Sequence, residues 1–367
     1  MELPFDPVQL NRPWDWDSLL PENRLPVLVT GVAGVVGFNA FHFLQQKYPG
    51  QVIGVRPVSN WKLVGDGIVG VDPEDTQQLA PLFEKHRFGS VLSCGGSCAL
   101  KSCELDPAMA QRVNVESVQS LLNVIGDSDT RLVHTSIDLV YSGASAGGYH
   151  EALPTDPVTR YGRTMVDAEQ RILKHRPDAM VLRISLPMGL SFNGHAGAID
   201  WIQNRFAKGR PATLYYDEVR TPTYAHCMNH LLEQLLSNDV GGLYHGGGPT
   251  RISLYQIAQI INRVGGYDPD LLHGCYRMQA GPIPPRAGNV TMDSSKLYGH
   301  FGTEVFCPWP YDQELMPTHK NWHYERPTSG SPHEVAERLY SLPGHFDGKQ
   351  NRAIRPEDKR IAGAVST

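Results

Sequence analysis

The feature that most constrains the fold is a regular alternation of short apolar runs and amphipathic segments along the first half of the chain. It begins with "LPVLVTG" (25–31), an apolar run that predicts a buried parallel strand. The next segment, "VAGVVGFNAFHFLQQKYPG" (32–50), places Phe38, Phe41 and Leu44 at helical spacing and ends on Pro-Gly. The same pattern predicts further strands at 51–56, 90–94, 131–136 and 179–185, and helices at 75–86, 107–126 and 161–175. Such alternation is typical of an α/β fold with a doubly wound parallel sheet and helices on both faces.

A glycine-rich turn, "VTGVAGVVG", joins the first strand to the first helix. Gly31 permits a tight turn, Gly34 lets the backbone approach a pyrophosphate, and Gly37 allows the helix to pack closely on the strand. The first helical residues, Val35 and Val36, would then present free N–H groups and a favourable dipole to phosphates. The turn therefore predicts a Rossmann-type dinucleotide-binding domain, with a purely structural turn as the alternative.

Other loops at the ends of predicted strands supply candidate cofactor contacts. After the second strand, "VIGVRPVSNW" offers Arg56 and no acid, which favours the 2′-phosphate of NADP, with NAD as the alternative cofactor. Asp72 stands where adenine contacts are common, although it could equally cap the next helix. The loop "CGGSCALKSC" adds Cys94, Gly95 and Gly96 to the candidate cofactor-binding residues.

The pattern loosens after residue 186. Helices are expected at 198–209, 224–236 and 253–265, and a strand at 241–247. We therefore expect a dinucleotide-binding domain at 25–186, to which 222–248 returns, and a smaller substrate-binding lobe at 187–221 and 249–330. They are flanked by an N-terminal extension, 1–24, and a C-terminal tail, 331–367. In the extension, Trp14 and Trp16 should pack on the body of the protein.

Composition excludes several classes of function. The net charge is −5 and no basic stripe argues for nucleic acid. No run of 18 apolar residues predicts a membrane span, and the acidic start is unlike a secretory signal, so a cytoplasmic protein is expected. The six cysteines have spacings that match no common zinc or iron–sulfur site, so no metal is expected.

Several segments, in order, resemble one known family. These are "AQRVNVESVQSLL" with Asn114, "RLVHTSIDLVYSG", "YGRTMVDAEQRIL" and "PPRAGNVTMDSSKL". They resemble the dTDP-4-dehydrorhamnose reductases, a family of extended short-chain dehydrogenase/reductases, over about residues 25 to 300. The resemblance implies NAD(P)H-dependent reduction of a 4-keto nucleotide sugar and assigns Asn114 to the cofactor region. The same family includes the regulatory beta subunit of methionine adenosyltransferase, whose main role is not turnover.

The resemblance also exposes two departures in the catalytic triad. Tyr161 occupies the position of the family's acid, but the Lys expected four residues later is Met165. A Lys there would share a helix face with Tyr161 and lower the pKa of its phenol, which a thioether cannot do. The family's Ser or Thr is replaced by Ile137, and the neighbouring Ser136 should face the other side of the strand.

Three functions stay open at this point. The first is a nucleotide-sugar reductase with Tyr161 as proton donor, and the second is a catalytically impaired nucleotide-binding regulatory or sensor protein. The third is an enzyme of different chemistry on the same scaffold. Ser136, Asp138, Tyr141 and Arg220 are candidate substrate contacts, and a homodimer is an open option for assembly.

Overall fold

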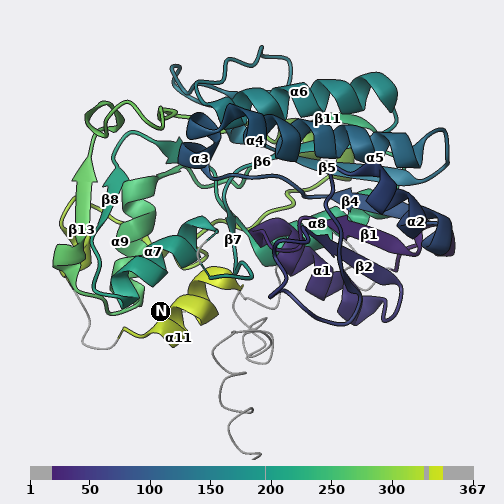
Figure 1. Cartoon of the computed structure of the whole chain (residues 1–367). Coiled ribbons are helices and arrows are strands. Elements are labelled where there is room, and N and C mark those ends of the chain that lie inside the picture. Colours follow the sequence, from purple (N-terminus) through teal and green to yellow (C-terminus); the bar gives the residue numbers. More distant parts are fainter. Residues whose placement is uncertain (1–18, 195, 326–329, 342–367) are drawn as a thin grey trace, which may run out of the picture.

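The computed structural model of the chain describes residues 19–194, 196–325 and 330–341 (Figure 1). Within them, a seven-stranded sheet has the order β11-β6-β5-β4-β1-β2-β3, and every neighbouring pair is parallel. Its strands are β1 (Val27–Thr30), β2 (Val52–Arg56), β3 (Ile68–Gly70), β4 (Ser90–Ser93), β5 (Arg131–Ile137), β6 (Met180–Ile184) and β11 (Gly242–Gly246). The strand order reverses between β1 and β4, and ligands of such sheets bind outside the carboxyl ends of the strands at that point. The predicted α/β fold is confirmed.

Helices cover both faces of this sheet (Figure 1). One face carries α1 (Val35–Lys47) and α8 (Ala225–Ser237), whose apolar side chains share a core with β1 and β6. The opposite face carries α2 (Thr76–His86), α5 (Ser117–Ile125) and α6 (Arg160–His175), whose side chains form a separate core with β4 and β5. The sheet is therefore buried on both sides, which explains why its strands read as continuous apolar runs.

The predicted helix at 107–126 is one helical stretch with a wide turn inside it. It comprises α4 (Pro107–Gln111), a π-helical turn (Arg112–Glu116) and α5. The Asp106 carboxylate accepts a hydrogen bond from the Met109 N–H (2.9 Å) and caps α4, with Pro107 as its first residue. The π turn carries Asn114, and such turns occur frequently at functional sites. A short preceding helix, α3 (Leu100–Leu105), and strand β3 were not predicted.

The remaining elements form a smaller lobe beside the carboxyl ends of the strands (Figure 1). Strand β8 (Ala212–Tyr215) pairs with β13 (Leu272–Cys275), β9 (Val219–Arg220) with β12 (Ile252–Ser253), and β7 (Pro187–Met188) with β10 (Thr223–Tyr224). Its helices are α7 (Ala198–Ala207), α9 (Leu254–Val264), α10 (Ser295–Phe301) and α11 (Pro332–Val335). Between β10 and β12 the chain returns to the seven-stranded sheet, where it supplies α8 and β11.

Both chain ends are described in part. In the N-terminal extension, Leu20 is buried, whereas the expected packing of Trp14 and Trp16 concerns positions outside the described residues. In the tail, Val335 and Leu339 are fully buried, and the Trp309 indole N–H donates to the Leu339 carbonyl (3.0 Å). Residues 331–341 are thus attached to the folded body through buried apolar side chains.

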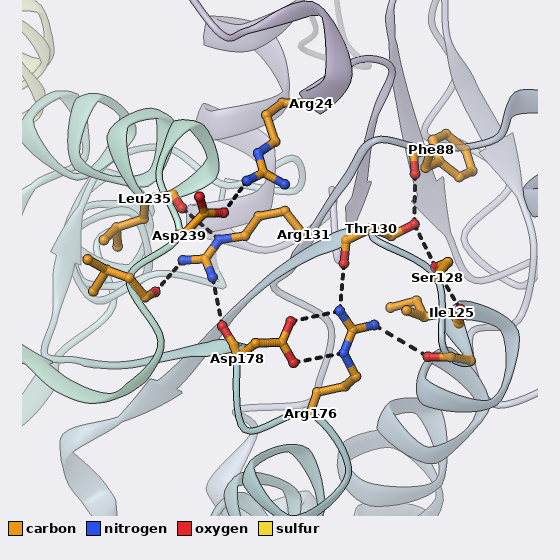
Figure 2. A network of polar contacts seen from close by, with 12 residues as sticks. Arg24, Phe88, Ile125, Ser128, Thr130, Arg131, Arg176, Asp178, Leu235 and Asp239 are labelled. Carbon is orange, nitrogen blue, oxygen red and sulfur yellow. Dashed lines mark hydrogen bonds and ion pairs between the residues drawn. The ribbon is translucent and has the colours of Figure 1, made fainter.

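Charged side chains connect the loops at the amino ends of the sheet strands (Figure 2). Buried Arg131, at the start of β5, donates to the backbone carbonyls of Leu235, Asp178 and Val240. Figure 2 also shows Arg176 bonded to both carboxylate oxygens of Asp178 (3.0 and 2.8 Å) and Arg24 paired with Asp239. A cavity of about 520 Å³ lies among these groups. Because the strands are parallel, this cavity lies at the opposite end of β5 from the predicted ligand site.

Candidate functional site

The turn between β1 and α1 has the geometry of a pyrophosphate cradle. Gly31 has φ +70°, and a Cβ added to it would lie 2.3 Å from the Cys94 carbonyl oxygen. A Cβ on Gly37 would lie 2.3 Å from the Gly31 carbonyl oxygen. Gly34 precedes α1, and no described side chain caps that helix, so the N–H groups of Val35 and Val36 have no side-chain acceptor. These residues fit a dinucleotide phosphate.

The loop after β4 is fixed beside that turn. Gly95 N–H donates to the Thr30 hydroxyl (3.2 Å), and Ser97 N–H donates to the Asn114 amide oxygen (2.7 Å). Gly96 has φ +143°, and an added Cβ there would lie 3.0 Å from the same amide oxygen. Burial raises the pKa of the Cys94 thiol to about 12, so Cys94 is a packing residue rather than a nucleophile.

Arg56 and Asp72 lie near each other at the ends of β2 and β3. The Arg56 guanidinium donates to the carbonyls of Leu63 (2.6 Å) and Pro57 (3.1 Å). The Asp72 carboxylate accepts from the Val58 N–H (2.8 Å). Asp72 is not the cap of α2, because the Asp75 carboxylate takes that role.

The three triad positions come together in one apolar cluster. Tyr161 and Met165 are buried, 7% and 4% exposed, and belong to the same cluster, against which the partly buried Ile137 packs. Thr159 caps α6 by accepting from the Gly162 N–H (2.9 Å), which starts the helix just before Tyr161. Among the described residues, the Tyr161 hydroxyl has no hydrogen-bond partner, which leaves it available to a ligand.

Tyr161 is held in its protonated form. Burial raises the pKa of its phenol well above the ordinary value of 10, and the nearby Cys98 and Asp138 raise it further, while Arg220 opposes them. The hydroxyl can therefore donate a proton across the physiological pH range, and it is a poor base.

Asp138 and Arg220, both expected to contact substrate, are bonded to each other. Both are buried, at 0% and 3% exposure, and the guanidinium donates hydrogen bonds to both carboxylate oxygens. The Ser185 hydroxyl donates to Asp138 as well (2.6 Å), and Glu218 lies 3.7 Å from Arg220. Arg286 adds a further ion pair to Glu218 (3.1 Å). This buried network lies next to Tyr161 and contributes to the electrostatics of its hydroxyl.

Ser136 and Tyr141 belong to a different network, which does not include Tyr161. The Ser136 hydroxyl donates to Glu169, and Arg183 donates to both oxygens of that carboxylate (2.9 and 2.6 Å). Arg183 also donates to the Tyr141 hydroxyl (2.6 Å), which lies 3.1 Å from His245 Nε2. The network joins β5, α6, β6 and β11 behind the site.

Sequence reasoning missed Glu169, Arg183, Glu218 and Thr164. Thr164 receives a hydrogen bond from the Asn114 amide (2.9 Å), which fixes the π turn against α6. The one available signal was the presence of ionisable residues within apolar segments, such as Arg183 in "MVLRIS". No group of His, Cys, Asp and Glu among the described residues could hold a metal ion, and no described helix is long and apolar enough to cross a membrane.

Comparison with known proteins extends this description. The family model of the RmlD substrate binding domain matches residues 25–318. The chain is 26% identical over 234 residues to a probable low-salt glycan biosynthesis reductase, Agl14, of Haloferax volcanii, covering 63% of this chain and 78% of that protein. It is 30% identical over 247 residues to a probable dTDP-4,6-dihydroxy-2-methyloxan-3-one 4-ketoreductase of Streptomyces antibioticus, covering 66% and 78%.

Another relative is named for a different role. Methionine adenosyltransferase 2 subunit beta of Xenopus laevis is 23% identical over 297 residues, covering 77% of this chain and 83% of that protein. Among solved structures, dTDP-4-dehydrorhamnose reductase of Bacillus anthracis in complex with NADP superposes with a TM-score of 0.66 at 17% identity, covering 77% and 95% of the two chains. The fold is thus shared with a reductase of known structure, and the sequence is similar to proteins named for both roles.

Proposed function

The chain belongs to the RmlD substrate binding domain family of extended short-chain dehydrogenase/reductases, and on this premise we propose that it is an NADP-dependent reductase of a 4-keto nucleotide sugar. The relatives named as reductases support this proposal. NADPH, when bound, would supply the hydride to the keto carbon. Tyr161 would supply the proton to the resulting oxyanion, so that the ketone becomes a secondary alcohol.

The observation that carries the proposal is the state of the Tyr161 hydroxyl. It has no partner among the described residues, and its raised pKa keeps it protonated. Gly31, Gly34 and Gly37 would cradle the phosphates of the cofactor in the same lobe, and the Asn114–Thr164 hydrogen bond ties the first turns of α6 to the π turn. An acid of this kind favours reduction over oxidation, because oxidation would require Tyr161 to act as a base.

The substitutions at 137 and 165 set the expected rate. Without a Lys at 165, no ammonium orients the nicotinamide ribose or tunes the phenol, and Ile137 cannot hydrogen-bond the keto oxygen. Loss of positioned acid–base groups costs a factor of roughly 10²–10⁴, so slow turnover is expected.

The direct test supplies NADPH and a dTDP-4-keto-6-deoxy sugar and follows the nicotinamide absorbance. Tyr161→Phe should lower the rate by at least about 100-fold. Tyr324→Phe, at an exposed tyrosine, should leave it unchanged. Retention of full activity by Tyr161→Phe would exclude Tyr161 as the proton donor.

A regulatory nucleotide-binding role is the second candidate. The positions of the family's Lys and Ser/Thr hold Met165 and Ile137, two apolar residues of one cluster, rather than other polar groups. The similarity to a methionine adenosyltransferase subunit supports it. In that case NADPH raises the melting temperature without turnover of any 4-keto sugar. The Met165→Lys, Ile137→Thr double variant then separates the two roles, since activity appearing only in that variant marks a protein that has given up catalysis.

A further inference from the structure

Two cysteines that are far apart in the sequence, Cys227 and Cys307, meet in the fold. Cys227 lies in the first turn of α8 and is only 3% exposed, whereas Cys307 follows α10 and is partly exposed. Their thiols are hydrogen-bonded to each other, and the Cys227 sulfur also accepts a hydrogen bond from the Cys307 backbone N–H. Neither is in a disulfide, so the pair is a dithiol whose sulfurs are already neighbours.

The surrounding contacts hold the two cysteine-bearing segments against each other. The Tyr224 hydroxyl, just before α8, accepts a hydrogen bond from the Tyr311 N–H (2.9 Å). Trp309, close to Cys307 in the sequence, is buried in the same apolar core as Cys227. A disulfide requires cysteines whose backbones are already close, and these contacts meet that condition without a large rearrangement.

Cys307 is the member of the pair that is suited to react first. The hydrogen bond with the Cys227 thiol lowers the pKa of Cys307 below its ordinary value of 9.0. In the other cysteines, all of which the structure also describes, the pKa of the thiol is raised: Cys94, Cys98, Cys103, Cys227 and Cys275. Because the thiolate is the nucleophile, an oxidant that reaches the partly exposed Cys307 meets the most reactive of these groups.

We propose that Cys227 and Cys307 are a redox-active pair that hydrogen peroxide converts reversibly into a disulfide. The Cys307 thiolate attacks one peroxide oxygen and becomes a sulfenic acid, while the other oxygen leaves as hydroxide and takes up a proton. The Cys227 thiol then attacks the sulfenic sulfur, and its proton leaves with the sulfenic hydroxyl as water. Both sulfurs are oxidised and the peroxide is reduced to water, and exchange with an external dithiol restores the two thiols.

The disulfide would fasten the smaller lobe to the sheet. Cys227 belongs to α8, which covers one face of the sheet, and Cys307 follows α10 of the smaller lobe. A cross-link between residues so far apart in the sequence closes a long loop in the unfolded chain, so the oxidised protein should be the more stable form. Neither thiol belongs to the cluster around Tyr161, so this redox chemistry is independent of the proposed reductase activity.

The test treats the full-length protein with hydrogen peroxide and maps its disulfides by mass spectrometry without reduction. We expect a peptide pair joined through Cys227 and Cys307, and a rise of about 5 °C in melting temperature that dithiothreitol reverses. Cys307→Ser, at the partly exposed member of the pair, should show neither change. The matched control is Cys275→Ser, at another partly exposed cysteine, which should respond like the wild type.

Cys227→Ala separates the two steps of the reaction. Without the second thiol, Cys307 should stop at the sulfenic acid and become labelled by dimedone after peroxide treatment. The assignment is wrong if peroxide leaves both thiols of the wild type free, or if it links either of them to a different cysteine. An equal rise in melting temperature in the wild type and in Cys307→Ser would place the effect of oxidation elsewhere, which also overturns the assignment.

Discussion

Position 165 shows how one side chain changes the chemistry available to its neighbour. Met165 shares an apolar cluster with Tyr161 and Ile137, so the surroundings in which an ammonium would have to sit are apolar. Without a nearby ammonium, burial dominates and the pKa of Tyr161 rises instead of falling. The residue is suited to giving up a proton only when a strong base forms beside it, as an alkoxide does during ketone reduction.

Met165→Lys should destabilise the protein free of nucleotide. The ammonium would be buried among apolar side chains without a carboxylate partner, at a cost of about 2 kcal/mol after local rearrangement. Gln170→Lys, at an exposed position of the same helix, should change the melting temperature little. Equal stability of the two variants in chemical denaturation would argue against an apolar pocket at 165.

His134 should make the fold sensitive to mild acid. It is buried on β5, and burial lowers its pKa to about 4, below the unfolded value near 6.5. Between these values the unfolded chain binds a proton that the native protein does not, so stability is complete above pH 6.5 and is lost as the pH falls toward 4. The loss attributable to His134 is about 3 kcal/mol.

The matching variant is His134→Gln, measured by urea unfolding from pH 7 to pH 4. Its stability should fall less steeply with decreasing pH than that of the wild type. His273→Gln, at an exposed histidine, should retain the wild-type slope. An unchanged slope in His134→Gln would mean that other groups control acid unfolding.

Individual residues also show which features of the site could be predicted from the sequence. Gly31 and Gly37 were predictable because their backbone demands are local, and the shared face of Tyr161 and Met165 followed from helical spacing. The place of Ile137 beside them was implied only by the resemblance to the reductase family. The engagement of Arg220 with Asp138 was not predictable, because these residues are 82 positions apart and sequence does not reveal which charges will meet. Whether these residues contact ligands stays a prediction.

At the scale of elements, α6 is attached to the sheet by a buried ion pair as well as by packing. Glu169 on α6 and Arg183 on β6 have side chains only 4% and 5% exposed. Helix α6 carries Tyr161, so this pair helps to hold on the sheet the helix from which the hydroxyl projects. Breaking the Glu169–Arg183 ion pair should lower the free energy of unfolding considerably, because the remaining buried charge would be poorly solvated without its partner.

Glu169→Gln should therefore lower the free energy of unfolding by about 3 kcal/mol. Adding Arg183→Met should recover part of that loss, since the uncompensated charge is removed. Glu74→Gln, which breaks the more exposed pair with Arg112, should cost less than about 1 kcal/mol. A double variant that is no more stable than Glu169→Gln would assign the loss to packing rather than charge.

The elements themselves were predictable where the pattern was long and regular, and not where it was short. Strands β1, β2, β4, β5 and β6 are apolar runs, and the helices around them have clear periodicity. Strand β3 has three residues and a partly exposed pattern, and α3 is hidden in a cysteine- and glycine-rich segment. The π turn within 107–126 leaves no periodic signal, because it shifts the helix by a single residue.

For the whole molecule, the segment 330–341 packs against the smaller lobe and stabilises it. Leu339 is fully buried, and the carbonyls of Arg338 and Leu339 accept bonds from Tyr224 (3.1 Å) and Trp309 (3.0 Å). Leu339→Ala should cost about 2–4 kcal/mol, whereas Glu337→Ala at an exposed neighbour should cost little. Thermal unfolding of the two variants checks this, and similar melting temperatures would show that the segment adds no stability.

The return of the chain to the sheet through β11 has a consequence for how the protein can be divided. Strand β11 pairs with β6 along its whole length, yet it follows the first part of the smaller lobe in the sequence. A fragment ending before residue 242 would leave β6 as an open edge, with backbone N–H and C=O groups free to pair with another chain. The two lobes are consequently not separable by a single cut in the sequence. A chimaera that takes the smaller lobe from a relative would need more than one junction, because β11 has to remain with the sheet.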